Sequence, residues 1–86
     1  MASPEAVARV QSVKAKHEHE LMRKRNVVGV GVGLRKRAGQ MTDEVCIVVS
    51  VREKLPLDQL ASKDVIPTEL DGVRVDVQAT GTLRAL

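Results

Sequence analysis

The stretch that decides the fold runs Val27-Val28-Gly29-Val30-Gly31-Val32-Gly33-Leu34-Arg35. Valine and glycine alternate in it with a period of two, which is the period of a β-strand. One face of the strand is expected to carry Val28, Val30, Val32 and Leu34. The other face carries only Gly29, Gly31 and Gly33, so it is an almost bare backbone surface. Because glycine weakens a strand, this pattern indicates that another backbone or a helix approaches closely there.

A second strand is predicted over residues 44–53, and Leu55-Pro56 ends it. Its apolar side chains alternate along one face, as Val45, Ile47, Val49 and Val51. Cys46 and Val48 lie on the opposite face, so this strand is expected to be central and covered on both sides. Residues 36–42 are expected to join the two strands through a connection somewhat longer than a tight turn.

The C-terminal half predicts one more strand. Leu57-Asp58-Gln59-Leu60 favours a short helix or turn, and Pro67 prevents a long helix. Asp71-Gly72 is typical of a turn, and residues 73–77 then alternate as a half-exposed third strand. The long connection before this strand permits a parallel crossover from the second strand.

The N-terminal segment predicts a helix that ends near Arg25. Ser3 is a good N-cap, Pro4 suits the first helical position, and Glu5 lies near the positive end of the helix dipole. The apolar stripe of this helix consists of Ala6, Val10, Val13, His17 and Leu21. Asn26 is expected to close the helix.

These elements predict an α+β fold, in which a long N-terminal helix packs on a small three-stranded sheet in the order α-β-β-short α-β. The whole chain, 1–86, is expected to form one domain. It divides into the helix (1–25), a β-rich part (26–81) and a short tail (82–86) that is loose or used in assembly.

The composition makes the core small and purely aliphatic. The 86 residues include no Phe, Tyr or Trp, and Cys46 is the single cysteine, so no disulfide forms within the chain. A core of this kind is often stabilised by oligomerisation. No signal-peptide core and no run of about 20 apolar residues is present, so the protein is expected to be cytoplasmic and not to cross a membrane.

The motifs that resemble chemical sites are incomplete. The Gly29-x-Gly31-x-Gly33 run lies within a strand and lacks the glycine spacing of a dinucleotide-binding loop. His17 and His19 are two residues apart on a helix and point in different directions, so they do not suit one metal ion. Neither Cys46 nor Ser50 has the surroundings of a catalytic nucleophile. No catalytic residue, metal site or cofactor is therefore predicted.

Two basic triplets stand out in a chain of net charge +3. They are Arg23-Lys24-Arg25 and Arg35-Lys36-Arg37. If the helix end and the hairpin tip lie near each other, the triplets form one patch that contacts nucleic-acid phosphates. Stacking on single-stranded bases is excluded, because the chain has no aromatic residue.

Several runs resemble a known family. They are Arg25-Asn26-Val27-Val28-Gly29-Val30-Gly31-Val32-Gly33, Val51-Arg52-Glu53-Lys54-Leu55-Pro56, and Ile66-Pro67 followed by Leu70-Asp71-Gly72-Val73. Over residues 25–81 the chain resembles the N-terminal segment that precedes the catalytic domain in a bacterial and plant branch of trypsin-like serine peptidase homologues. The resemblance implies no catalytic residue here, since the family carries its Ser-His-Asp machinery downstream.

The leading hypothesis is a non-catalytic interaction or self-assembly module, which forms a homo-oligomer or binds a protein partner. Its interaction residues are expected to be Gly29, Gly31 and Gly33, together with both basic triplets. One alternative is a basic nucleic-acid-binding protein. The other, which depends on the resemblance, is a regulator or prosegment-like partner of a separate serine peptidase.

Overall fold

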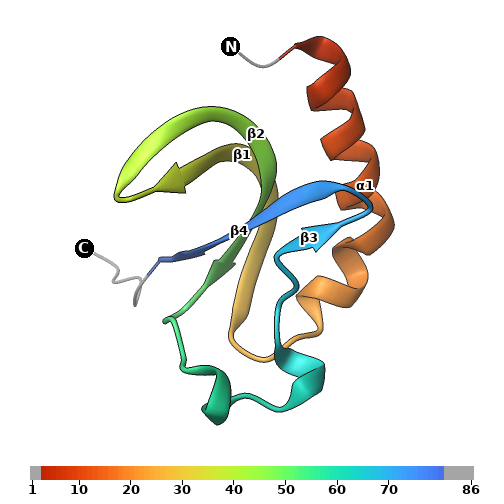
Figure 1. Ribbon diagram of the computed structural model, residues 1–86. Helices are drawn as coiled ribbons and strands as arrows, with labels where there is room; N and C mark the ends of the chain where they lie inside the picture. The colour runs from red at the N-terminus through yellow and green to blue at the C-terminus, as the bar shows by residue number, and fades with distance from the viewer. Residues whose placement is uncertain (1–2, 81–86) are drawn as a thin grey trace, which may run out of the picture.

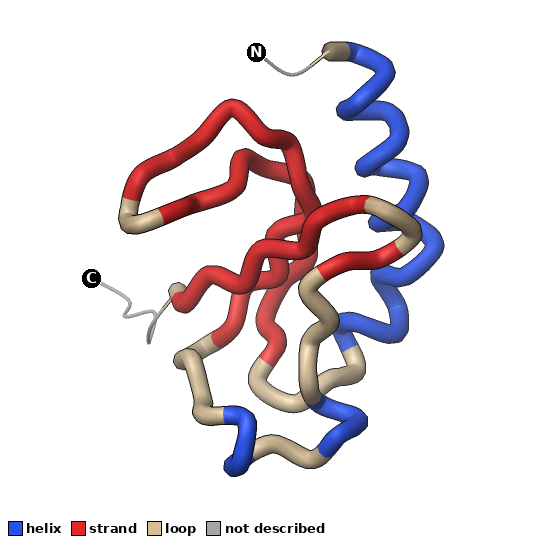
Figure 2. Tube along the Cα trace, in the orientation of Figure 1, coloured by secondary structure: helices blue, strands red, loops and turns tan. Residues whose placement is uncertain are grey.

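The computed structural model describes residues 3–80. One helix lies along one side of a strand layer, and the tip of a long strand hairpin lies on the opposite side of the molecule (Figures 1 and 2). The elements in chain order are α1 (Pro4–Met22), β1 (Val27–Arg37), β2 (Gln40–Val51), the 3-10 turns η1 (Leu57–Gln59) and η2 (Ser62–Asp64), β3 (Glu69–Leu70) and β4 (Val73–Ala79). The predicted tail, 82–86, lies outside the described residues.

The sheet has four strands in the order β1-β2-β4-β3. The α+β class is confirmed, and so is the crossover, because β2 and β4 run parallel. The prediction of three strands is wrong, since the two-residue strand β3 pairs antiparallel with the start of β4. A strand of two residues is too short for an alternating pattern to reveal it.

Helix α1 begins as predicted and ends earlier than predicted. The backbone N–H of Ala6 donates a 3.1 Å hydrogen bond to Oγ of Ser3, which confirms the N-cap. The helix ends at Met22, so residues 23–25 form a loop turn after the helix and do not belong to its last helical turn. Asn26 leaves this turn with a φ of 77°, a left-handed conformation that asparagine tolerates better than most residues.

The core lies between α1 and one face of the sheet. Strand β2 is central, as predicted, and its Ile47, Val49 and Val51 are at most 2% exposed. Helix α1 covers them with its own buried residues, which are Val10, Val13 and Leu21. Strand β4 completes the core with Val73 and Val75.

Strand β1 departs from the predicted alternation at its first residues. A β-bulge between Val27 and Gly29 shifts the register against β2. As a result Val27 packs against the core and Val28 is 46% exposed, whereas Val30 and Val32 pack against the core as expected. A bulge places two residues of one strand opposite one of its partner, so the period of two is interrupted there.

The β1–β2 connection is a two-residue turn, so the prediction of a longer connection over 36–42 is wrong. Ala38 and Gly39 have φ values of 52° and 78°, and Arg37 pairs with Gln40. Positive φ at both central residues is the geometry of a tight hairpin turn. The short helix or turn predicted over Leu57–Leu60 corresponds to the 3-10 turn η1, and η2 follows it in the chain. The predicted turn at Asp71-Gly72 is confirmed.

The outer half of the hairpin bends over the sheet face that α1 leaves uncovered. A second register shift, between Leu34 and Lys36, permits the bend. The backbone N–H of Lys36 then donates a 2.9 Å hydrogen bond to Oδ2 of Asp76 in β4, a strand to which β1 is not adjacent. In Figure 1 the hairpin arches away from α1 toward the side where β4 ends.

Candidate interaction surface

The glycine face of β1 is an open hollow of about 400 Å³. A Cβ atom placed on Gly31 would have no atom within 4 Å, and one on Gly29 would lie 3.8 Å from Cβ of Ser50. Only Gly33 is crowded, since its Cβ would lie 3.0 Å from Cγ2 of Val48. The predicted close approach of another backbone or helix is therefore not made by any described residue, because α1 packs on the opposite, valine-bearing face.

The outer edge of β1 is unpaired over residues 3–80, where β2 is its single neighbour in the sheet. Every second residue of such an edge points its N–H and C=O away from the sheet. From Val27 to Leu34 the strand contains no charge and no proline, the usual means of protecting an edge. We call the glycine face together with this edge the β1 surface.

The structure does not bring the two basic triplets together. They lie at opposite ends of β1, an 11-residue strand with a contour of about 35 Å at roughly 3.3 Å per residue. Lys24 donates to the carbonyl oxygen of Lys63, and Arg35 forms a 3.1 Å ion pair with Glu44. The other four cations are exposed and have no ion-pair partner among residues 3–80: Arg23, Arg25, Lys36 and Arg37. The two triplets are therefore separated along β1, and the exposed Lys54 lines one pocket with Arg25 and another with Lys36.

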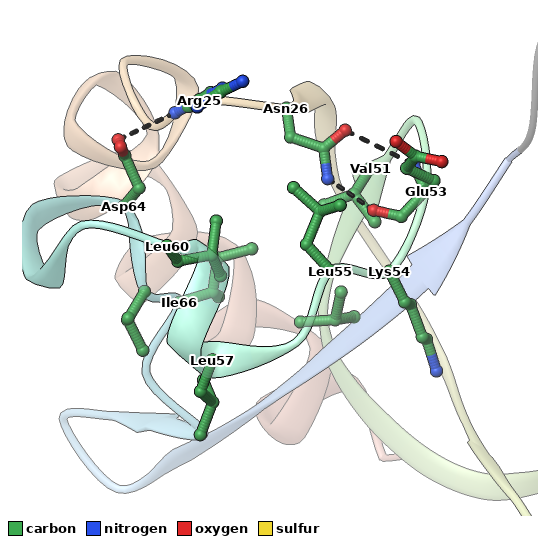
Figure 3. A pocket seen from close by; sticks show the side chains of 12 residues that line it. Arg25, Asn26, Val51, Glu53, Lys54, Leu55, Leu57, Leu60, Asp64 and Ile66 are labelled. Atoms are coloured by element: carbon green, nitrogen blue, oxygen red, sulfur yellow. Dashed lines mark hydrogen bonds between the residues drawn. The ribbon is translucent and has the colours of Figure 1, made fainter.

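A smaller apolar pocket of about 250 Å³ lies under the crossover connection between β2 and β3 (Figure 3). Its apolar walls are Val51, Leu55, Leu57, Leu60, Val65, Ile66 and Val77. The backbone N–H of Arg25 donates a 2.9 Å hydrogen bond to Oδ1 of the buried Asp64 at its rim. None of the predictions from the sequence included this pocket, although the recurring leucines over residues 55–60 were a signal of it.

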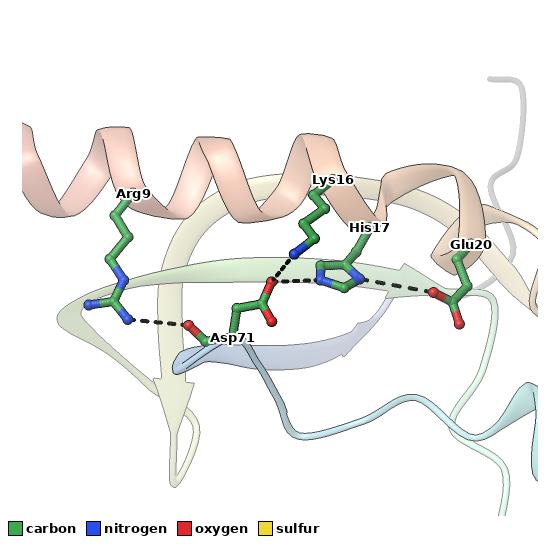
Figure 4. Close-up of polar contacts among 5 residues, drawn as sticks. All are labelled: Arg9, Lys16, His17, Glu20 and Asp71. Carbon is green, nitrogen blue, oxygen red and sulfur yellow. Dashed lines mark hydrogen bonds and ion pairs between the residues drawn. The ribbon is translucent and has the colours of Figure 1, made fainter.

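A polar cluster ties α1 to the turn between β3 and β4 (Figure 4). Oδ2 of Asp71 lies 2.9 Å from Nε2 of His17 and 3.3 Å from Nζ of Lys16. Nη2 of Arg9 donates to the carbonyl oxygen of Asp71, and Glu20 lies 3.9 Å from Nδ1 of His17. These contacts hold the helix on the sheet, which gives His17 a structural role.

The hydrogen bonds from His17 and Lys16 lower the pKa of Asp71 below its ordinary value of 3.8. The stability that the charged carboxylate contributes is therefore present above that value and is lost as the pH falls through the lowered pKa. We expect Asp71→Asn to be less stable than the wild type at pH 6, and the difference to narrow as the pH falls toward 3. Asparagine tolerates the φ of 50° at this position, so the backbone stays unstrained. Urea unfolding over this pH range measures the effect, and a difference independent of pH would contradict it.

Cys46 is fully buried and free, as predicted. Burial, with smaller contributions from Asp76 and Glu44, raises the pKa of its thiol from 9.0 to about 11. Since the thiolate is the reactive form, about one thiol in a thousand is ionised at pH 8. We expect iodoacetamide to alkylate the folded chain at least about 100-fold more slowly than the chain in denaturant. Mass spectrometry of timed samples gives both rates, and equal rates would contradict the burial of this thiol.

Among residues 3–80, no three His, Cys, Asp or Glu side chains gather into a group that could hold a metal ion. No helix in this range is long and apolar enough to cross a membrane.

The fold and the β1 surface define a small α+β domain with a mixed sheet, in which no strand among residues 3–80 pairs with the outer edge of β1. The chain belongs to the family of NARROW LEAF 1 N-terminal domains, whose family model matches residues 5–80. No curated protein matches the chain.

The resemblance to a segment of trypsin-like serine peptidase homologues is therefore wrong, because the family that matches is a NARROW LEAF 1 N-terminal domain and not a peptidase segment. The first and longest of the runs behind that resemblance alternates valine and glycine, a pattern that follows from the period of two of a β-strand and is not specific to one family. The hypothesis of a partner for a separate serine peptidase depended on the resemblance and loses its basis.

Proposed function

We propose that this domain is a non-catalytic interaction module that binds a protein partner through the β1 surface. The observation that carries the proposal is the open space above Gly31, where no atom lies within 4 Å of a Cβ position. Each glycine in a strand interior costs roughly 0.5–1 kcal/mol relative to alanine, and β1 contains three. Contact of another molecule with this face would offset the stability that the three glycines cost the strand.

The size of the core supports the same proposal. The fully buried side chains of the described residues are aliphatic or sulfur-containing, with Leu21, Ile47, Val49 and Cys46 the largest. A domain of this size has a small margin of stability, to which burial of the β1 surface would add. The exposed side chains Met41 (57%) and Leu34 (38%) line the hollow and would be buried in the same contact.

The two basic triplets lie apart along β1, and the chain has no aromatic residue on which bases could stack. We therefore take a protein, either a second copy of the chain or another polypeptide, as the partner class. The experiment below distinguishes these two partners.

Photoreactive methionine incorporated in cells tests the proposal and carries its own control. Met41 lines the hollow on the glycine face, whereas Met22 is 44% exposed at the end of α1 and does not line it. After irradiation, we expect intermolecular cross-links at Met41 that mass spectrometry assigns to one partner, and none to that partner at Met22. Cross-links between two Met41-containing peptides would identify a second copy.

Two results would contradict the proposal. Equal cross-linking at Met41 and Met22 would indicate chance collisions, and the absence of any cross-link at Met41 would show that the hollow meets no partner.

A further inference from the structure

The apolar pocket under the crossover connection lies apart from the hollow on the glycine face, with which it shares no lining residue (Figure 3). We propose that this pocket is a second interaction surface, which binds an acidic polypeptide segment. One large apolar side chain of the segment enters the pocket, and its carboxylates contact the cations around the rim. Three observations carry the proposal: the walls of the pocket, the charges beside it, and the contacts that bring these charges together.

The walls of the pocket select an apolar side chain. Seven of the lining residues are valines, leucines or isoleucine, around a volume of about 250 Å³. An apolar cavity of about 150 Å³ is large enough to bind benzene, so the pocket has room for one large side chain. Leu57 lines it with 71% of its own surface exposed. A side chain in the pocket would remove Leu57 as well as itself from water, which favours binding.

Cations outnumber carboxylates around the pocket. Two polar pockets adjoin it, one of which shares Asp64 with it and the other Arg25. Asp64 is buried and already accepts the backbone N–H of Arg25, whereas five of the six cations along the three pockets are exposed. An anionic partner complements this excess of positive charge. The six cations, which we call the basic pole, are Arg23, Lys24, Arg25, Arg52, Lys54 and Lys63, and the carboxylates along the same pockets are Glu20, Glu53 and Asp64.

Hydrogen bonds between three segments hold the basic pole together. The backbone N–H of Arg52 donates a 3.0 Å hydrogen bond to the carbonyl oxygen of Asn26. The side-chain amide of Asn26 donates to the carbonyl oxygen of Glu53 and accepts its backbone N–H, as Figure 3 shows. Nζ of Lys24 donates a 2.6 Å hydrogen bond to the carbonyl oxygen of Lys63. Cations that lie far apart in the sequence are therefore fixed at one end of the molecule, around one pocket.

The combination of a pocket with cations favours a polypeptide over other anions. Nucleic acid would contact the cations through its phosphates and leave the apolar pocket unfilled, and the chain has no aromatic residue on which bases could stack. A bilayer is bound by apolar side chains that protrude into it, whereas most apolar side chains here line a depression. A polypeptide supplies carboxylates and an apolar anchor within a few residues of each other.

The probe is the peptide Glu-Asp-Glu-Leu-Asp-Glu-Asp with acetyl and amide ends, titrated into the ¹⁵N-labelled full chain and followed by NMR. We expect amide shifts to change at residues 23–26, 52–57 and 63–66, and not at residues 30–40. Replacement of the peptide's leucine by serine is expected to weaken binding at least about tenfold, because the apolar burial is lost. The same peptide with lysine in place of its acidic residues is expected not to bind.

Variants with opposite expected effects locate the peptide on the basic pole. Arg25→Gln and Lys54→Gln are each expected to weaken binding about threefold to tenfold at low salt, and Glu53→Gln is expected to strengthen it by a similar factor. Leu57→Ser is expected to weaken binding about tenfold and, at so exposed a position, to leave the fold intact. Arg74→Gln removes an exposed cation that lines none of the three pockets, and is expected to change the affinity less than twofold.

The proposal is overturned if the peptide does not bind, if the leucine and serine peptides bind equally, or if Glu53→Gln weakens binding as Lys54→Gln does. A single-stranded oligonucleotide or a phosphatidylserine vesicle that displaces the peptide at equal charge concentration would instead assign the basic pole to nucleic acid or to a bilayer. The Met41 cross-links test the β1 surface separately, and none of these results changes their meaning.

Discussion

Replacement of Ile47 by alanine is expected to lower the free energy of unfolding by about 3 kcal/mol, within the range for large-to-small changes in tightly packed cores. Ile47 is 0% exposed in the central strand, and it is one of the largest fully buried side chains of the described residues. Small domains have little stability to lose, so much of the Ile47→Ala protein is expected to be unfolded at 37 °C.

Urea unfolding followed by circular dichroism measures this change. Ile47→Val is expected to lose about 1 kcal/mol, because it leaves a smaller cavity. Met41→Ala, at a side chain that is 57% exposed, is expected to change stability by less than about 0.5 kcal/mol. Equal losses for Ile47→Ala and Met41→Ala would show that the core does not lie between α1 and β2.

Replacement of Gly31 by valine is expected to abolish binding at the β1 surface without lowering stability. A Cβ at this position meets no atom within 4 Å, and valine favours a strand, so stability is expected to stay equal or to rise by up to about 1 kcal/mol. The new side chain stands in the hollow, where it occupies the space of the partner's side chains. Met41 cross-linking on the one hand, and urea unfolding on the other, measure the two effects separately.

Gly33→Val is the control for this variant. Its Cβ would lie 3.0 Å from Cγ2 of Val48, so this substitution is expected to reduce stability as well as binding. Unchanged Met41 cross-linking in a folded Gly31→Val protein would mean that the glycine face takes no part in the contact.

Much of the fold could be predicted from local patterns. The Ser3 cap and Pro4 marked the start of α1, and the alternation around Ile47 marked β2 as the central strand. The dipeptide Asp71-Gly72 marked the last turn, where both residues have positive φ. Each of these signals lies within a few neighbouring residues, so the sequence alone carries it.

The features that were mispredicted depend on contacts between distant residues. The bulge at Val28 and the bend after Leu34 arise where β1 is fitted to β2 and to Asp76. Strand β3 exists because β4 provides its pairing partner. No local periodicity records these long-range contacts, so a pattern of single residues could not reveal them.

The candidate site was predictable in part. The bare face of Gly29, Gly31 and Gly33 follows from a period of two, and the structure confirms that these residues share a hollow. Whether α1 packs on the glycine face or on the valine-bearing face could not be predicted from the sequence, because nothing in a local pattern fixes the side of the sheet on which the helix lies. The separation of the two basic triplets likewise depends on the length and course of β1.

Residue-resolved amide hydrogen exchange by NMR tests most directly whether the edge of β1 is free in the single chain and paired in the complex. For the chain alone at low concentration, slow and fast amides are expected to alternate from Gly29 to Leu34, because every second N–H points away from β2. With the partner bound, the fast amides are expected to become slow. Uniformly slow exchange along β1 in the isolated chain, or an alternation that stays unchanged in the complex, would contradict the account.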